Sequence, residues 1–164
     1  MDLFGKEPRP AFNNQMRTEL AKKLGEQVNN WCNNETSLED CISDTEEILK
    51  HNINGDGYEL AKEFEDKGYG ADSELVEILD GVWFQTSKLV RDAIKRWVIT
   101  DDIKPQFEIG TTVIVNYGSK KVEGQITDIN TDTAEYLVCI FSEGMEIDKT
   151  RRAIIKYENA EALK

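Results

Sequence analysis

The sequence predicts an α+β protein in which a small N-terminal helical bundle precedes a C-terminal five-stranded β-barrel. From about Asn13 to Trp97, apolar residues recur every three or four positions, which is the spacing of amphipathic helices. After Thr100 the apolar residues alternate with polar ones, as they do in half-buried strands. Pro105 lies where the period changes and disfavours helix in the residue before it, so it marks the boundary between the two regions.

We expect five parts along the 164-residue chain. Residues 1–10 hold two prolines and no periodicity, so they are predicted to be an arm or a disordered tail. The acidic helical bundle covers residues 11–99, a linker 100–106, the barrel 107–158 and a tail 159–164. No apolar run is long enough for a membrane span or a secretory signal, so we expect a cytoplasmic protein without a membrane partner.

The first two helices are predicted from apolar spacing and from capping residues. The first begins near Asn13 and ends near the pair Asn33-Asn34. The second is predicted to begin at Thr36, because Glu39 follows three residues later, as in a capping box. It ends at the turn-rich residues 52–57.

Two further helical segments follow that turn. A short helix covers residues 58 to about 66. The last segment begins after Asp72 and keeps helical spacing as far as Trp97. Gly81 interrupts this segment and is expected either to kink it or to divide it into two helices.

Five short strands are predicted in the C-terminal region, separated by turns that contain glycine, serine, threonine or aspartate. They cover residues 113–117, 122–129, 136–141, 146–148 and 153–157. Five strands of this length are enough to close a small barrel.

The order of motifs in this region resembles that of a known fold family. The motifs are Ile109-Gly110-x-x-Val113, Gly124-x-Ile126 with Ile129, and Tyr136-x-Val138 running into Phe141. Over residues 107–158 the chain resembles an SH3-like barrel of the Tudor or KOW kind, which implies a docking module for peptides, methylated side chains or nucleic acid. Tudor readers tend to have aromatic residues near the positions of Val122 and Glu123, where this chain has none, so we expect no recognition of a methylated cation.

The charge of the chain is concentrated in one segment. Lysine and arginine number 20 against 32 aspartates and glutamates, which gives a net charge of −12. Residues 35–80 contain fifteen acids and three bases, so this segment alone carries a net charge of −12. A chain with this balance is not expected to be an ordinary phosphate-binding protein.

Residues suited to catalysis or to metal binding are few. His51 is the only histidine, and the three cysteines are far apart in the sequence, so neither a zinc site nor a disulfide framework is expected. The sequence has no nucleophile elbow and no phosphate-binding loop. We therefore expect a protein that is not an enzyme and that has no cofactor.

One segment fits the spacing of a calcium-binding loop. The matching residues are Asn52, Asn54, Asp56, Gly57 and Glu63. Asn52 lacks the charge of the usual aspartate, Glu59 replaces an apolar residue, and the sequence holds no second loop. An ordinary connection between two helices explains the same residues, because asparagine, aspartate and glycine all favour turns.

Carboxylates recur on successive turns of the predicted helices, and DNA also presents closely spaced negative charge. The predicted partner-binding residues are Glu39, Asp40, Asp44, Glu46, Glu47, Glu59, Glu63, Glu65, Asp66, Glu74 and Glu77. This pattern predicts docking on the basic, nucleic-acid-binding surface of a protein partner, although an acidic face also keeps a small protein in solution. In size, charge and lack of catalytic residues the chain resembles phage inhibitors of host nucleases, the anti-CRISPR and anti-restriction proteins.

A nucleic-acid-binding accessory module is the alternative interpretation. The barrel would contact RNA or DNA through Lys120, Lys121, Lys149, Arg151 and Arg152. The last helix carries a second group of bases, Lys88, Arg91, Lys95 and Arg96, which a solvated helix face also explains. The sequence leaves the oligomeric state open.

Overall fold

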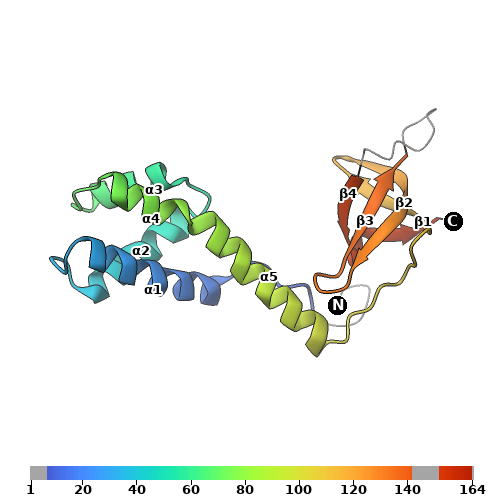
Figure 1. Cartoon of the computed structure of the whole chain (residues 1–164), viewed down its shortest axis with the longest axis horizontal. Helices are drawn as coiled ribbons and strands as arrows, with labels where there is room; N and C mark the ends of the chain where they lie inside the picture. Colours follow the sequence, from blue (N-terminus) through green and yellow to red (C-terminus); the bar gives the residue numbers. More distant parts are fainter. Residues whose placement is uncertain (1–6, 142–151, 164) are drawn as a thin grey trace. The chain divides into compact units, whose positions relative to one another are not determined.

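The computed structural model describes residues 7–141 and 152–163, which form two compact units. We call Ala11–Val90 the helical unit and Met1–Pro10 together with Arg91–Lys164 the sheet unit. The described residues contain five α-helices followed by a five-stranded antiparallel sheet (Figure 1), so the predicted α+β class is confirmed. No helix of the described residues is long and apolar enough to cross a membrane.

The predicted helices are present, and the last predicted segment is divided in two. The helices are α1 (Asn14–Trp31), α2 (Leu38–His51), α3 (Gly57–Asp66), α4 (Ser73–Asp80) and α5 (Val82–Thr100). Gly81 lies between α4 and α5 and donates its backbone N–H to the carbonyl of Leu79, so it ends one helix before the next begins. The boundary between the two units falls within α5, after Val90.

The N-cap of α2 lies one residue after the position predicted from the sequence. Ser37, and not Thr36, is the N-cap, and its Oγ accepts the backbone N–H of Asp40 at 3.1 Å. The carbonyl of Thr36 instead accepts a hydrogen bond from the side chain of Asn29 at 2.7 Å. The capping box predicted at Thr36 and Glu39 is not formed. A capping box that was not predicted lies at the start of α3, where Asp56 and Glu59 each bond the backbone N–H of the other.

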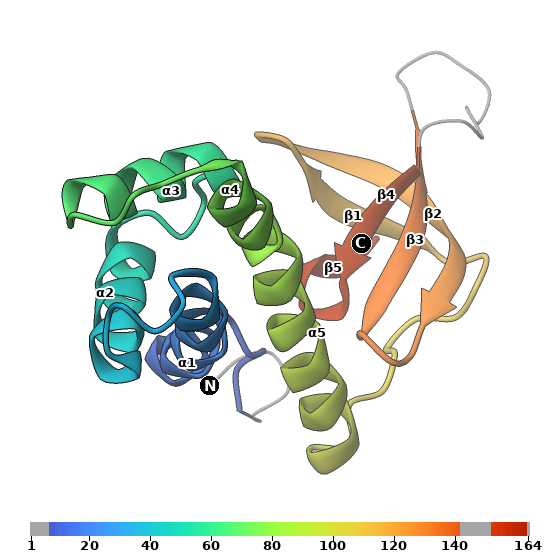
Figure 2. The ribbon, with the colours of Figure 1, turned by 60° about the vertical axis from the view of Figure 1, so that its left-hand side comes forward.

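One apolar core holds the helical unit together. Its fully buried side chains include Leu20, Leu24, Val28, Leu60, Phe64 and Leu75, which come from α1, α3 and α4. The helices α1 and α2 lie side by side (Figure 2), and Gly25 allows their backbones to approach closely near Ile42. Burial of these side chains is the main contribution to the stability of the unit.

The sheet has the strand order β4-β3-β2-β1-β5, and every neighbouring pair is antiparallel. The strands are β1 (Thr112–Tyr117), β2 (Lys120–Asn130), β3 (Glu135–Ile140), β4 (Arg152–Lys156) and β5 (Ala160–Ala162), with a 3-10 helix, Tyr157–Asn159, before β5. Buried residues of alternate positions, such as Val113, Val115 and Val138, form the core under the sheet together with Trp97 of α5.

Two terminal segments differ from the sequence prediction. Residues 160–162 were assigned to a tail, but they form β5, since Ala160 is buried and pairs with Val115. Residues 7–10 were assigned to an arm or a disordered tail, but Arg9 is bound to the sheet unit by several hydrogen bonds. The strand predicted at 146–148 lies outside the described residues.

Candidate functional site

The acidic helices of the helical unit are the candidate site. Residues 11–90 hold 17 acids and 7 bases, a net charge of −10, so the sheet unit carries only −2 of the total of −12. The predicted partner-binding carboxylates lie on α2, α3 and α4, and both α2 and α4 pack against α3. Eight of these eleven residues are exposed, and the other three, Asp44, Glu46 and Glu63, are half-buried.

Lys67 neutralises two of the carboxylates. Its Nζ lies 3.0 Å from Asp44 Oδ1 and 2.7 Å from Glu47 Oε2. The Lys67 hydrogen bond lowers the pKa of Glu47, and the bonds to Glu47 and Asp44 raise the pKa of Lys67. Tyr69 adds a third link, because its hydroxyl donates to Asp44 Oδ2 at 2.9 Å. These contacts join α2 to the segment after α3, so Asp44 and Glu47 have a structural role.

Three more of the predicted residues have partners within the fold. Glu46 accepts a hydrogen bond from the Thr18 hydroxyl at 2.6 Å, which links α2 to α1. Asp40 accepts one from Ser37 at 2.6 Å, and Glu59 belongs to the capping box of α3. The sequence alone does not identify the pair of Thr18 and Glu46, because these residues are 28 positions apart.

Six of the eleven predicted carboxylates have no hydrogen-bond or ion-pair partner among residues 7–141 and 152–163. We call them the unpaired carboxylates: Glu39, Glu63, Glu65, Asp66, Glu74 and Glu77. They are carried by helices that are fixed by the core, and five of them are exposed. This group can attract a cationic surface without first breaking a bond inside the protein.

A groove lies beside the unpaired carboxylates, between α3 and the start of α4. It has a volume of about 440 Å³ and is lined by Tyr58, Ala61, Lys62, Glu65, Ala71, Asp72, Ser73 and Val76. Tyr58 is 59% exposed, and Lys62 Nζ lies 4.5 Å from the centre of its ring. Tyr58 is not among the predicted site residues, although an aromatic residue four positions before a lysine is a recognisable pair on a helix.

Asp72 caps α4 and joins it to α1. Its Oδ1 accepts the backbone N–H groups of Leu75 and Glu74 at 3.0 and 2.9 Å and the indole N–H of Trp31 at 3.1 Å. The Leu75 hydrogen bond is the main reason that the pKa of Asp72 lies below its usual value, and the Trp31 and Glu74 bonds lower it further. The charged form of Asp72 therefore stabilises the folded helical unit.

We expect Asp72→Asn to weaken the acid dependence of the stability of the helical unit. A lowered pKa in the folded state gives stability that is present above the ordinary aspartate pKa of about 3.9 and is lost as the pH falls through the folded value. Asparagine still accepts the cap hydrogen bonds but does not titrate. Urea midpoints measured at about pH 6 and about pH 3 should differ less in the variant than in the wild type. An equal difference in both proteins would contradict this assignment.

The calcium-loop residues are arranged as a helix start. Helix α3 begins at Gly57, so Tyr58, at the position whose backbone carbonyl binds calcium in such a loop, already lies in a helix. Asp56 and Glu59 bond each other's backbone, and Gly57 donates its N–H to Asp80 Oδ1 at 2.8 Å. These contacts agree with the alternative interpretation of residues 52–63, an ordinary connection between two helices.

The reactive side chains of the described residues are dispersed. The three cysteines form no disulfide bond with one another, and burial raises the pKa of the Cys41 thiol, which disfavours the nucleophilic thiolate. No group of three or more histidines, cysteines, aspartates and glutamates within the described ranges is placed to hold a metal ion. His51 is exposed at the end of α2.

The basic residues of the alternative interpretation are only partly described. Lys149 and Arg151 lie outside the described residues, and Lys121 forms an ion pair with Glu161 at 2.6 Å. On α5, Lys95 forms an ion pair with Asp132 at 3.4 Å, while Lys88, Arg91 and Arg96 are exposed. Lys120 and Arg152 are also exposed.

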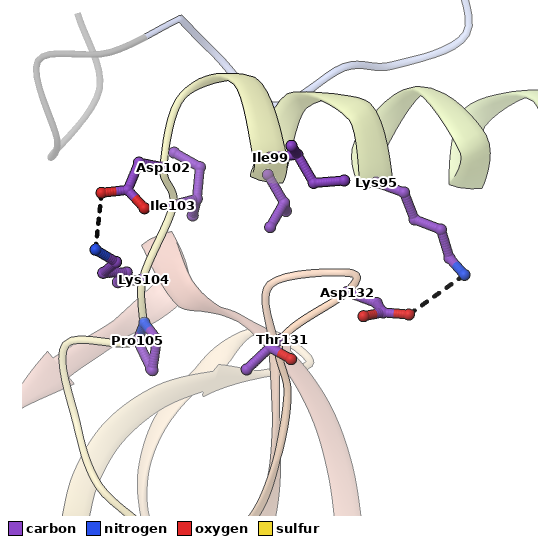
Figure 3. A pocket seen from close by; sticks show the side chains of 9 residues that line it. Lys95, Ile99, Asp102, Ile103, Lys104, Pro105, Thr131 and Asp132 are labelled. Atoms are coloured by element: carbon purple, nitrogen blue, oxygen red, sulfur yellow. Dashed lines mark ion pairs between the residues drawn. The ribbon is translucent and has the colours of Figure 1, made fainter.

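The sheet unit has a pocket of its own, between the end of α5 and the turn after β2 (Figure 3). Its volume is about 520 Å³, and its apolar lining comes from Val98, Ile99, Ile103 and Pro105. Two ion pairs, Lys95 with Asp132 and Lys104 with Asp102, lie at its edge. The pocket therefore combines an apolar lining with charged side chains at its edge.

Comparison with known proteins finds no matching family model, no matching curated protein and no matching solved structure. The chemistry of the candidate site is therefore inferred from its own residues.

Proposed function

We propose that this chain is a non-enzymatic binding protein whose acidic helices dock on the basic, nucleic-acid-binding surface of a protein partner. The observation that carries the proposal is the set of six unpaired carboxylates on three packed helices. A protein that needed these acids only for its own ion pairs would place cations beside them. Residues 35–80 supply three lysines, and one of these, Lys67, already bonds Asp44 and Glu47.

The electrostatics favour association with a cation-rich surface. The helix fixes the backbone of each unpaired carboxylate, so binding a partner orders side chains and not the backbone. A net charge of −10 in the helical unit attracts a basic partner from a distance and raises the association rate. Screening acts over about 10 Å at 0.1 M salt, so the complex is expected to dissociate as the salt concentration rises.

The groove beside α3 gives this surface a place for a basic side chain. Ala61, Ala71 and Val76 can pack against the aliphatic part of a lysine or arginine, while Glu65 and Asp72 face its charge. A partner that reads DNA or RNA carries such side chains in its binding groove. We therefore propose the class of host defence nucleases, which phage inhibitors of the anti-CRISPR or anti-restriction type bind, as the partner class.

We also propose that the sheet curls into an SH3-like barrel. Strands β4 and β5 are the two edges of the sheet, yet only Tyr157–Asn159 connects them. Four strand spacings of about 4.8 Å would separate the edges of a flat sheet by roughly 19 Å, whereas three residues of 3-10 helix advance only about 6 Å. The irregularity of β2 between Ile126 and Asp128 adds a bend in the same sheet.

A comparison of neutralised variants tests the proposed function. The test variant combines Glu65→Gln, Asp66→Asn and Glu74→Gln, and the control combines Asp92→Asn, Glu108→Gln and Glu123→Gln, three exposed acids of the sheet unit. Each immobilised protein is incubated at low salt with a nuclease-treated bacterial lysate, and retained proteins are quantified by mass spectrometry. An exposed ion pair with the partner contributes about 0.5 kcal/mol, and the test variant loses three of them. We therefore expect retention to be roughly tenfold weaker for the test variant and unchanged for the control.

The retained protein is then purified and its nucleic-acid binding is measured with and without this chain. Competition by the wild type and by the control variant, with weak competition by the test variant, supports the proposal. Equal retention by all three proteins, or a retained protein that still binds nucleic acid in the presence of excess chain, refutes it.

The nucleic-acid accessory module is the second proposal, and a filter-binding assay separates the two. Retention of labelled RNA or DNA by the wild type, lost when the five barrel bases are replaced by alanine, would favour the module. The five bases are Lys120, Lys121, Lys149, Arg151 and Arg152. No retention by the wild type would remove this alternative.

A further inference from the structure

The sheet unit binds a short segment from the N-terminal end of the chain. Arg9 of this segment is almost fully buried, with 7% of its side chain exposed. Its Nε donates to Glu158 Oε1 at 2.6 Å, and its two terminal nitrogens donate to the carbonyls of Thr133 and Ala134 at 2.7 Å each. A further bond, from Nη2 to Glu158 Oε2 at 3.0 Å, makes the contact with the carboxylate bidentate.

Trp97 completes the environment of Arg9. The guanidinium carbon lies 5.3 Å from the centre of the indole ring, within the range of a cation–π contact. The same indole donates its Nε1–H to the backbone carbonyl of Glu7 at 3.0 Å. The site therefore contacts both the side chain of Arg9 and the backbone of Glu7, two residues before it.

The bound segment has the properties of a peptide ligand. Pro8 and Pro10 flank Arg9, and each disfavours helix in the residue before it, so the backbone of the segment is held extended before it binds. Residues 7–10 form no helix or strand. Eighty residues separate Pro10 from Arg91, where the sheet unit resumes, so the segment joins the unit as a separate piece of chain.

We propose that Trp97, Glu158 and the carbonyls of Thr133 and Ala134 form a recognition site for arginine in an extended, proline-flanked peptide, and that this chain fills the site with its own Arg9. A peptide of the same kind from another polypeptide binds there when Arg9 is absent. This inference is independent of the acidic helices and of the function proposed for them.

The contacts select arginine over lysine. The three nitrogens of the planar Arg9 guanidinium donate four hydrogen bonds, in directions that suit one carboxylate and two carbonyls. A lysine ammonium is a single point of charge and cannot bond Glu158 in a bidentate manner while stacking on Trp97. Burial raises the pKa of Glu158, but the Arg9 hydrogen bonds, a hydrogen bond to the backbone of Glu158 and the positive charges of Arg9 and Lys156 together lower it. The carboxylate is therefore ionised, as this recognition requires.

The covalent link of Arg9 to the protein explains why the site stays filled. A tethered segment competes with an effective concentration in the millimolar range, so a free peptide of low affinity is excluded from the wild-type protein. Replacement of Arg9 removes the side chain that fills the site, and the tethered segment then keeps, among the described residues, only the hydrogen bond between the Glu7 carbonyl and Trp97.

Titration of the full-length R9A variant with a capped peptide of sequence EPRPA, which is the sequence of residues 7–11, tests the proposal. The indole N–H resonance of Trp97, assigned with a W97F variant, reports binding. We expect the peptide to bind R9A at least tenfold more tightly than the wild type. The same peptide with lysine in place of arginine should bind R9A at least tenfold more weakly than the arginine peptide does. The arginine peptide should also bind the double variant R9A/E158Q at least tenfold more weakly than it binds R9A.

The lysine peptide separates arginine recognition from general attraction between charges. Equal binding of the two peptides overturns the proposal. It is also overturned if R9A is folded and the Trp97 resonance does not move at peptide concentrations above the millimolar range. Should R9A be unfolded, the R9K variant, which keeps a cation near Glu158, takes its place, and the same outcomes apply to it.

Discussion

Replacing Phe64 by alanine is expected to lower the free energy of unfolding of the helical unit by about 3–5 kcal/mol. The Phe64 side chain is fully buried among the residues of α1, α3 and α4 that form the core. Its ring meets the ring of Tyr69 edge-on, with 5.1 Å between the centroids and an angle of 89° between the planes. The substitution loses the apolar burial and this aromatic contact, and it leaves a cavity that the helices can only partly fill.

Urea-induced unfolding followed by helical circular dichroism measures this effect. Leu38→Ala is the matched control, because Leu38 is an apolar residue of the same unit with 44% of its surface exposed. The control should change the free energy of unfolding by no more than about 0.5 kcal/mol. A similar loss in both variants would mean that Phe64 does not occupy the core.

The aromatic contact also connects this core to the acidic site. Tyr69 packs on Phe64 with its ring and donates its hydroxyl to Asp44, which is held in turn by Lys67. Burial raises the pKa of Tyr69, so the hydroxyl stays protonated and able to donate at neutral pH. The positions of the carboxylates on α2 and of the end of α3 therefore depend on the same apolar contacts that stabilise the unit.

The helices and four of the strands, β1 to β4, could be predicted because their signals are local. Leu20, Leu24 and Val28 recur at helical spacing in the sequence and are buried together in the structure. The N-cap of α2 is Ser37 where Thr36 is predicted, because threonine and serine are both suited to capping and stand side by side. Local spacing shows that an element exists more reliably than it shows at which residue the element begins.

The remaining features depend on contacts between distant parts of the chain. Strand β5 has only three residues, and it exists because Ala160 and Ala162 pair with β1, about 45 positions earlier. Arg9 and Glu158 are 149 positions apart, so no pattern in the sequence indicates their ion pair. In the same way, the sequence identified the acidic helices but could not separate the carboxylates that Lys67 and Thr18 engage from the unpaired ones.

Replacing Gly25 by alanine is expected to lower the free energy of unfolding of the helical unit by about 2 kcal/mol, although alanine is the better helix former. Within a helix, glycine to alanine normally adds 0.5–1 kcal/mol of stability, so helix propensity alone predicts about that gain. At this position, however, an added Cβ would lie 2.7 Å from the Cα of Ile42 and 2.9 Å from its backbone nitrogen. These are backbone atoms of α2, so no change of side-chain rotamer relieves the overlap, and α1 and α2 must move apart.

Lys22→Ala, an exposed substitution on the same helix, is the control, and it should stay within about 0.5 kcal/mol of the wild type in the same urea experiment. A Gly25→Ala variant that is more stable than the wild type would show that the two helices are not in close backbone contact.

Because α2 carries Glu39 of the unpaired carboxylates, separating it from α1 should also alter the acidic site. We therefore expect this variant to retain the proposed basic partner less strongly than Lys22→Ala does, even though neither substitution removes an acid.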